Sequence, residues 1–312
     1  MNSSILCSLP KRIERMPTSE PRYELSPKES ALAQTIISEL QDWPDKILNS
    51  HKAAGHPIHK LVFVADLGFT VNNPGIEPVV SKVLEHRSAQ GPLQVLMNIN
   101  PNYGGTGEDQ WAWALCDAPL LLYALVRFGL KDEPVVIKGI DHLVELQRKN
   151  GWPCAVSPEM GKFRGPGRKD DPCPYANLIM LQLLSVLSDR FNSPEAQLGA
   201  ETALTLWENR TSQHPYMFYA GTDFCKLKAP LGWYDIVHVL DVLSRFPYLR
   251  DDPRLLDMWQ IIQKKPITDD GYIPESIYQA WKDWDFGQKK TPSAYLTHVI
   301  RRIEKQLQNQ TT

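Results

Sequence analysis

The stretch IVHVLDVLSRFPYLRDDPRLLDMWQIIQKK (236–265) holds the pattern that decides the fold of this 312-residue chain. An almost wholly apolar run leads through a short polar turn to a proline, and an amphipathic run follows. Prolines in this setting recur at intervals of 60, 60 and 59 residues, at Pro74, Pro134, Pro194 and Pro253. A fixed period of this size indicates a repeated supersecondary unit. Proline suits the first turn of a helix, where its missing N–H is not needed.

The runs on the two sides of each proline predict two kinds of helix. Runs that are apolar all round predict buried inner helices. Runs with apolar residues at i, i+3 and i+4 predict outer helices with one buried stripe. The inner runs are 58–69, 120–128, 178–187, 236–246 and 293–303, and the outer runs are 30–48, 79–86, 135–149, 195–209 and 254–265.

The repeat predicts an all-α fold, an α/α toroid built as a closed barrel of five to six helical hairpins. The alternative is an open solenoid of stacked hairpins. We favour closure because the inner runs are apolar all round, whereas the concave helices of a solenoid stay in contact with water. We expect a flexible polar tail at residues 1–25 and a single toroid domain at residues 26–312.

Composition narrows the class of protein. The chain is 42% hydrophobic and 22% charged, with a net charge of −2, which is typical of a globular protein and gives no reason to expect nucleic acid as a partner. No apolar run approaches the roughly 18 residues that a membrane span needs. The N-terminal residues lack the pattern of a secretory signal. Five unclustered cysteines make disulfides unexpected, so we predict a cytoplasmic location.

Closure would bring the starts of the inner helices, fed by long connections, to one opening. The proline register places Cys116-Asp117, Asp171-Pro172-Cys173 and Trp233-Tyr234-Asp235 at these starts. A helix N-terminus carries partial positive charge and favours a thiolate. The predicted catalytic residues are therefore Cys116, Asp117, Cys173, Tyr234 and Asp235. The alternative is that the cysteines are small buried hydrophobes and the aspartates are helix caps.

The long connections contribute cations and aromatic rings. Cations beside helix N-termini suit a phosphate or carboxylate group. Aromatic walls hold apolar ligands or stabilise cations. The same residues could instead be solvated loop charges and packing between loops. The predicted substrate-binding residues are Trp113, Trp152, Arg164, Arg168, Trp233 and Trp281.

Two segments, ELQRKNGW (145–152) and QKKPITDDGY (263–272), keep the pattern of outer helix and Gly-aromatic turn. In this the chain resembles the terpenoid cyclase/protein prenyltransferase superfamily, over roughly residues 55–303. Squalene-type cyclases carry an Asp-x-Asp-Asp proton donor, and this string does not occur here. The resemblance therefore implies a small single-toroid relative whose chemistry does not depend on that donor.

The segment GKFRGPGRKDDPCPY (161–175) is similar to the basic, glycine-rich loop of protein prenyltransferase β subunits, which leads into two of three zinc ligands. Asp171 and Cys173 match those two positions. The family's third ligand is a histidine in a Tyr-His pair, where this chain has Tyr234-Asp235 and, one turn on, His238. The resemblance thus implies a possible zinc site at Asp171, Cys173 and either Asp235 or His238, and Cys116 could complete a two-cysteine site.

The sequence predicts an enzyme that acts on an isoprenoid or another apolar small molecule in a central, aromatic-lined cavity. Its chemistry would be Cys/Asp acid–base or zinc-assisted, in a cyclase, isomerase or transferase. One alternative is a glycoside hydrolase or lyase that uses Asp117 and Asp235 as its carboxylate pair. Another is a non-catalytic repeat protein that binds a partner, in which Cys116, Cys173 and Asp235 would not converge.

Overall fold

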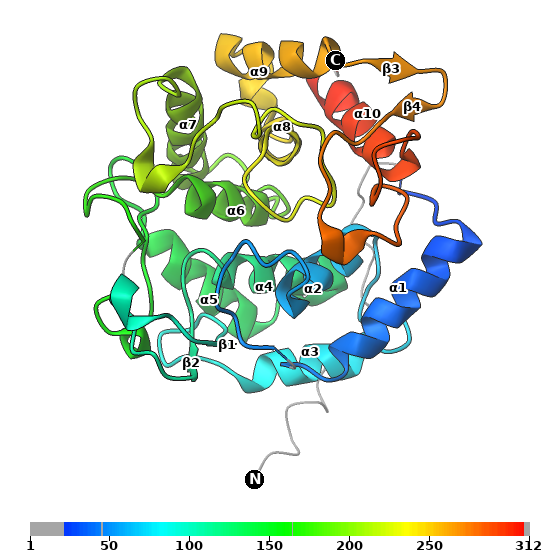
Figure 1. Ribbon diagram of the computed structural model, residues 1–312. Coiled ribbons are helices and arrows are strands. Elements are labelled where there is room, and N and C mark those ends of the chain that lie inside the picture. The colour runs from blue at the N-terminus through cyan, green and yellow to red at the C-terminus, as the bar shows by residue number, and fades with distance from the viewer. Residues whose placement is uncertain (1–21, 45, 164, 309–312) are drawn as a thin grey trace.

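The helical repeat is present in the computed structural model, which describes residues 22–44, 46–163 and 165–308. These residues form ten α-helices, and the all-α prediction is confirmed (Figure 1). The inner helices are α2 (Pro57–Asp66), α4 (Ala118–Leu125), α6 (Pro174–Leu184), α8 (Ile236–Leu243) and α10 (Ala294–Gln308). The outer helices are α1 (Pro27–Leu40), α3 (Ile76–Glu85), α5 (Pro134–Glu145), α7 (Pro194–Glu208) and α9 (Pro253–Gln263).

Three of the four periodic prolines begin an outer helix. Pro134, Pro194 and Pro253 are the first residues of α5, α7 and α9, whereas Pro74 lies two residues before α3. Side chains ahead of two of these prolines satisfy free N–H groups of the helices: Ser193 Oγ accepts from the N–H of Ala196 at 3.1 Å, and Asp252 Oδ1 accepts from the N–H of Arg254 at 2.9 Å. The proline period therefore marks helix starts, as the sequence predicts.

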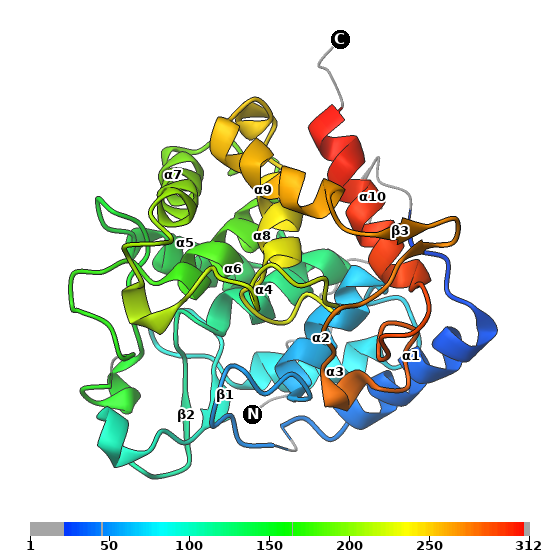
Figure 2. The ribbon, with the colours of Figure 1, turned by 45° about the horizontal axis from the view of Figure 1, so that its top comes forward.

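The inner helices form the core. Every residue of α4, α6 and α8 is buried. Each inner helix packs against the next in chain order, from α2 through α4, α6 and α8 to α10. The first and last are also in contact, since the rings of Phe63 on α2 and Tyr295 on α10 lie 5.3 Å apart between centroids. Figures 1 and 2 show α7 and α9 outside α6 and α8, on the side of the molecule away from α1 and α3.

Two predictions about the elements need correction. The outer helix predicted at 30–48 ends at Leu40. The chain turns at Gln41 and Asp42, and farther on the N–H of Leu48 donates to Leu96 O at 2.9 Å. The connections also contain two small antiparallel pairs that were not predicted, because strands of two or three residues leave no periodic signal. These are β1 (Val95–Met97) with β2 (Gln110–Ala112), and β3 (Ile267–Thr268) with β4 (Gly271–Tyr272).

The structure describes only residues 22–25 of the segment that was predicted to be a flexible tail. Residues 1–21 of the predicted tail lie outside the described residues. Tyr23 packs against Tyr295, with ring centroids 5.3 Å apart, and donates its hydroxyl to Glu29 Oε1 at 2.7 Å. The chain is thus attached to the helical core from at least Tyr23 onward. Among the described helices, none combines the length and the apolar character that a membrane crossing requires.

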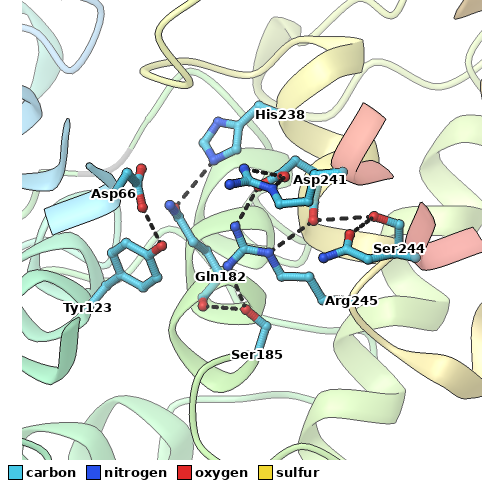
Figure 3. A network of polar contacts seen from close by, with 10 residues as sticks. Asp66, Tyr123, Gln182, Ser185, His238, Asp241, Ser244 and Arg245 are labelled. Carbon is cyan, nitrogen blue, oxygen red and sulfur yellow. Dashed lines mark hydrogen bonds and ion pairs between the residues drawn. The ribbon is translucent and has the colours of Figure 1, made fainter. Parts of the chain in front are cut away.

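A buried polar network lies between the inner helices (Figure 3). Asp241 on α8 has no exposed side-chain surface and accepts from Arg245 Nη2 and Arg302 Nη2, each at 2.6 Å. Burial alone would raise the pKa of this carboxyl, but the two guanidinium groups hold it at about 2. Nearby, Tyr123 on α4 donates to Asp66 Oδ1 at 2.5 Å. The centre is therefore held by paired charges and hydrogen bonds, which the apolar inner runs did not predict.

Candidate active site

The predicted catalytic residues gather at the starts of three inner helices. Asp117, Cys173 and Asp235 are the N-cap residues of α4, α6 and α8. Cys116 Sγ lies 3.9 Å from Cys173 Sγ. Tyr175 lies among them: its pKa is raised well above its usual value, first by burial and then by the charges of Cys116, Asp117, Cys173 and Asp235. Helix starts that are far apart in the sequence thus meet in one place.

Asp117 holds a carboxyl group with one oxygen in use and one without a partner. Oδ1 accepts from the N–H of Ala114 at 3.0 Å. Oδ2 is buried and has no hydrogen-bond partner among the described residues. Burial raises the pKa of Asp117 to about 8, although the backbone hydrogen bonds of Ala114 and Ala118 lower it. Burial therefore favours the protonated form of this carboxyl near neutral pH.

Asp235 repeats this arrangement at the start of α8. Its Oδ1 accepts from the N–H of His238 at 3.0 Å and caps the helix. Its Oδ2 is buried, and no described residue bonds to it. Burial raises the pKa of Asp235 to about 7. The hydroxyl of Tyr278 is likewise buried without a partner in the described ranges, and its pKa is raised by burial and by the charge of Asp235. Capping therefore accounts for only one oxygen of Asp235.

A third thiol, Cys154, belongs to the site and was not predicted. It forms a hydrogen bond with Cys116, and its Sγ accepts from the N–H of Gly165 at 3.2 Å. Cys154 lies inside a long connection, so the register of helix starts could not find it. The only sequence signal was its position just after the Gly-Trp turn at 151–152.

Tyr234 lies beside the cluster, in aromatic packing. Its ring contacts Phe218 and Phe224, with centroids 5.2 Å away in each case. Burial, and then the charge of Cys173, raises the pKa of the Tyr234 hydroxyl. This phenol therefore stays protonated at neutral pH and can act as a hydrogen-bond donor.

The residues suggested for zinc do not form a ligand set. His238 has both ring nitrogens engaged, Nδ1 with Trp233 O at 2.8 Å and Nε2 with Gln182 Oε1 at 3.3 Å. Asp171 is part of a loop turn, where its Oδ2 accepts from the N–H of Arg168 at 3.2 Å. In the part of the chain that the structure describes, no three His, Cys, Asp or Glu side chains are placed to hold a metal ion. Zinc stays a prediction without a ligand set.

A groove of about 910 Å³ opens beside the cluster. The loop containing Phe163, Gly165 and Gly167 forms part of its wall. Trp233 also lines it, with the Lys52 ammonium 5.6 Å from the centroid of the Trp233 ring. Four asparagines are among the lining residues, Asn49, Asn98, Asn100 and Asn102; of these, the Asn98 amide donates to Gly107 O and Asp109 Oδ1, and Asn100 Oδ1 accepts from the N–H of Asn102.

The residues predicted to bind substrate separate into two groups. Trp233 lines the groove, and Arg168 is exposed on the neighbouring loop. The others that the structure describes are core residues. Trp152 is wholly buried and donates Nε1 to Leu143 O at 2.9 Å, and Trp281 donates Nε1 to Ala54 O at 2.8 Å. Trp113 is buried as well, at 2% exposure. Arg164 lies outside the described residues.

The groove differs from the apolar central cavity that the sequence predicts. Its lining residues lie in the connections, whereas the space between the inner helices holds the network of Figure 3. Comparison with known proteins adds no relative: the chain matches no protein-family model, no curated protein and no solved structure. The resemblance to the terpenoid cyclase superfamily therefore rests on the sequence motifs alone.

Proposed function

We propose that the inner helices close into an α/α toroid with the candidate site at its mouth. The contact between Phe63 and Tyr295 supports closure, because it joins the first inner helix to the last. An open solenoid would separate these two helices by the length of the array.

At this mouth we propose an enzyme that transfers protons to or from its substrate. The observation that carries the proposal is the pair of buried carboxyl groups, Asp117 and Asp235, each with one oxygen that has no partner among the described residues. General acids and bases work best when their pKa lies near the working pH. Burial raises the pKa of these two groups to about 8 and about 7. Perturbed pairs of this kind are typical of active sites.

The substrate class that we propose is a linear isoprenoid or a similar apolar molecule with a polar or anionic end. The aromatic rings of Tyr103, Phe163 and Trp233 in the groove support an apolar part. Lys52 and Lys162 in the same groove support an anionic end. The reaction would be an isomerisation, cyclisation or transfer. We assign no step to zinc, because its suggested ligands do not converge.

The test follows the proton. The purified full chain is incubated in D₂O with a panel of linear isoprenoid alcohols, diphosphates and hydrocarbons, and products are analysed by mass spectrometry for deuterium. We expect incorporation by the wild type and a loss of about 10²-fold or more in Asp117→Asn and Asp235→Asn, the scale of acid–base catalysis. Asp189→Asn, at an exposed carboxylate beyond the end of α6, is the control and should keep its activity. Equal activity in all three variants would refute the proposal.

A second candidate is a glycoside hydrolase or lyase with the same two carboxyl groups. The four asparagines in the groove favour it, because amide side chains hydrogen-bond sugar hydroxyls and aromatic rings stack on sugar faces. A panel of oligosaccharides separates the candidates: cleavage that depends on Asp117 and Asp235, with no deuterium transfer to isoprenoids, would favour the glycoside hydrolase or lyase.

The third candidate is a binding protein without activity, for which we expect that Cys116, Cys173 and Asp235 do not converge. The charges of all three residues act on Tyr175, which argues against this candidate.

A further inference from the structure

One imidazole ring lies in the wall of the groove. His51 lines the groove together with Lys52 and Trp233, and its side chain is half-buried. A side chain in this position can touch a molecule that the groove holds. The function proposed above assigns no role to this ring.

Two other histidines lie near His51, and their rings are used in structural hydrogen bonds. His56 caps α2, with Nδ1 accepting from the N–H of Ile58 at 3.3 Å and Nε2 lying 3.1 Å from Lys46 O. His59 Nε2 lies 3.0 Å from His51 O. The His51 ring itself forms no hydrogen bond with any residue in the described ranges. Its nitrogens are therefore available to a molecule in the groove.

A hydrogen-bonded turn fixes the backbone of His51. The N–H of Ala53 donates to Ser50 O at 3.0 Å, and the N–H of Lys52 donates to Ser50 Oγ at 3.3 Å. Burial lowers the pKa of His59 to about 4, so near neutral pH its ring carries one proton, which Nε2 donates to His51 O. These bonds hold His51 in the wall of the groove, as a base that must meet its substrate in a fixed geometry requires.

The surroundings of His51 favour its neutral form. Burial lowers the pKa of the imidazole to about 4, and the charge of His56 acts in the same direction. The other titratable groups around the ring are His59 and two cations that line the same groove, Lys52 and Lys162. Cations nearby disfavour a further positive charge on the ring. The ring is therefore unprotonated near neutral pH and can accept a proton.

The groove also places a cation and an apolar wall beside this base. The Lys52 ammonium lies 5.6 Å from the centroid of the Trp233 ring, and both side chains line the groove. An aromatic ring holds the apolar part of a ligand, and an ammonium group stabilises negative charge on oxygen. Among the described residues that line the groove there is no aspartate or glutamate to oppose such a charge. A base, a cation and an apolar wall suit the removal of a proton next to a carbonyl group.

We propose that His51 is a base that takes a proton from the carbon next to a carbonyl group, in an apolar molecule held by the groove. The C–H bond breaks as an N–H bond forms on the ring, and the electron pair moves through a new C=C bond to the carbonyl oxygen. The Lys52 ammonium stabilises the charge on that oxygen. The imidazolium then returns a proton to the same carbon or to another one, so no further reactant is needed. The proposal rests on the groove of the function proposed above, but not on its two carboxyl groups.

The first test reads the state of the ring without turnover. Full-length protein is treated with limiting diethyl pyrocarbonate, which acylates unprotonated imidazole, at about pH 5.5 and about pH 7.5. N-acetylhistidine is the internal standard, and each histidine is followed by peptide mass spectrometry. The standard, with an ordinary pKa of about 6.5, should react about tenfold more slowly at the lower pH. We expect the rate of His51 to change by less than about twofold and to exceed that of His59 by at least about fivefold.

The second test follows the proton. The protein is incubated in D₂O with geranylacetone, a linear isoprenoid ketone, and deuterium at the carbons beside the carbonyl is measured by mass spectrometry. We expect exchange that is faster than in buffer and that falls about 10²-fold in His51→Gln, the scale of general base catalysis. Lys52→Met should slow it at least about tenfold, the scale of one hydrogen bond to a charged group. His214→Gln is the control, because this half-buried ring lies against Tyr219 and does not line the described groove.

The two tests can each overturn the proposal. Labelling of His51 that falls with pH like the standard, or that is no faster than that of His59, contradicts it. Exchange that the wild type does not accelerate, or that His51→Gln does not slow, contradicts it as well. Circular dichroism checks the fold of each variant. All of these results leave the carboxyl pair to be decided by its own variants, Asp117→Asn and Asp235→Asn.

Discussion

The centre of the inner helices, around Asp241, and their mouth, around Asp117 and Asp235, are both buried and polar. The pKa values of the carboxyl groups in these two regions are shifted in opposite directions. In the centre, Asp241 is paired with two guanidinium groups, and its pKa falls to about 2. At the mouth, Asp117 and Asp235 each keep a buried oxygen without a hydrogen-bond partner among the described residues, and burial raises their pKa to about 8 and about 7. A buried polar atom without a partner costs stability. The centre is thus built for structure, whereas the mouth carries a cost that a substrate or solvent contact would offset.

The largest effect that we expect comes from breaking the centre. Asp241→Ala removes the carboxylate shared by Arg245 and Arg302 and leaves two buried guanidinium groups without it. Loss of one member of a buried ion pair costs about 3–5 kcal/mol. Urea denaturation followed by circular dichroism measures the change in the free energy of unfolding. Asp171→Ala, in the loop at the mouth, is the control and should cost far less. A loss for Asp241→Ala of no more than that of the control would show that the network does not stabilise the fold.

The sequence could not have predicted this network. In the sequence, His238 and Asp241 only interrupt an apolar run. The run does not indicate which charged side chains would pair with them. Arg302 lies 61 residues after Asp241, on α10, the next inner helix along the chain, beyond a long connection that has no regular sequence pattern. Periodicity predicts which face of a helix is buried, but it does not predict which buried polar groups become partners.

Two tryptophan variants compare a buried position with a position in the groove, and we expect smaller changes in the free energy of unfolding than for Asp241→Ala. Trp152→Phe removes the Nε1 donor and leaves Leu143 O buried without its hydrogen bond, at a cost of about 1–3 kcal/mol. Trp233→Phe keeps an aromatic ring at a partly buried position that lines the groove and removes no hydrogen bond that the described residues form, so the free energy of unfolding should change less while ligand binding weakens. Thermal unfolding of the two variants side by side decides this. Equal destabilisation would mean that Trp233 is a core residue as well.

The mouth was more predictable than the centre because it follows helix starts. The constant proline spacing predicts that Cys116, Cys173 and Asp235 occupy equivalent positions in successive repeats. In the structure these three residues lie around Tyr175. Cys154 and Tyr278 were missed because they lie in irregular connections. The same limit explains Trp152 and Trp281: a sequence shows that a loop tryptophan exists, but its burial depends on tertiary packing.

The dependence of stability on pH gives the sharpest comparison, because the two regions predict slopes of opposite sign. The pKa of Asp117 is 3.8 when unfolded and about 8 when folded, so between these values only the native state holds the proton. Its stabilising contribution is full below about pH 4 and is lost as the pH rises to about 8, by about 1.4 kcal/mol per pH unit. Asp241 behaves in reverse: its contribution is present above its unfolded pKa of 3.8 and is lost as the pH falls toward about 2.

Asp117→Asn should therefore flatten the fall in stability between about pH 5 and pH 7, while keeping the hydrogen bond to Ala114. Asp235→Asn should do the same up to about pH 7, the pKa of that carboxyl. Urea denaturation of wild type and variants at a series of pH values gives the difference in slope, in which other titrating groups cancel. If the curves of wild type and both variants run parallel over this range, the mouth carboxyls are ionised in the folded protein, and neither could act as the proton donor proposed here.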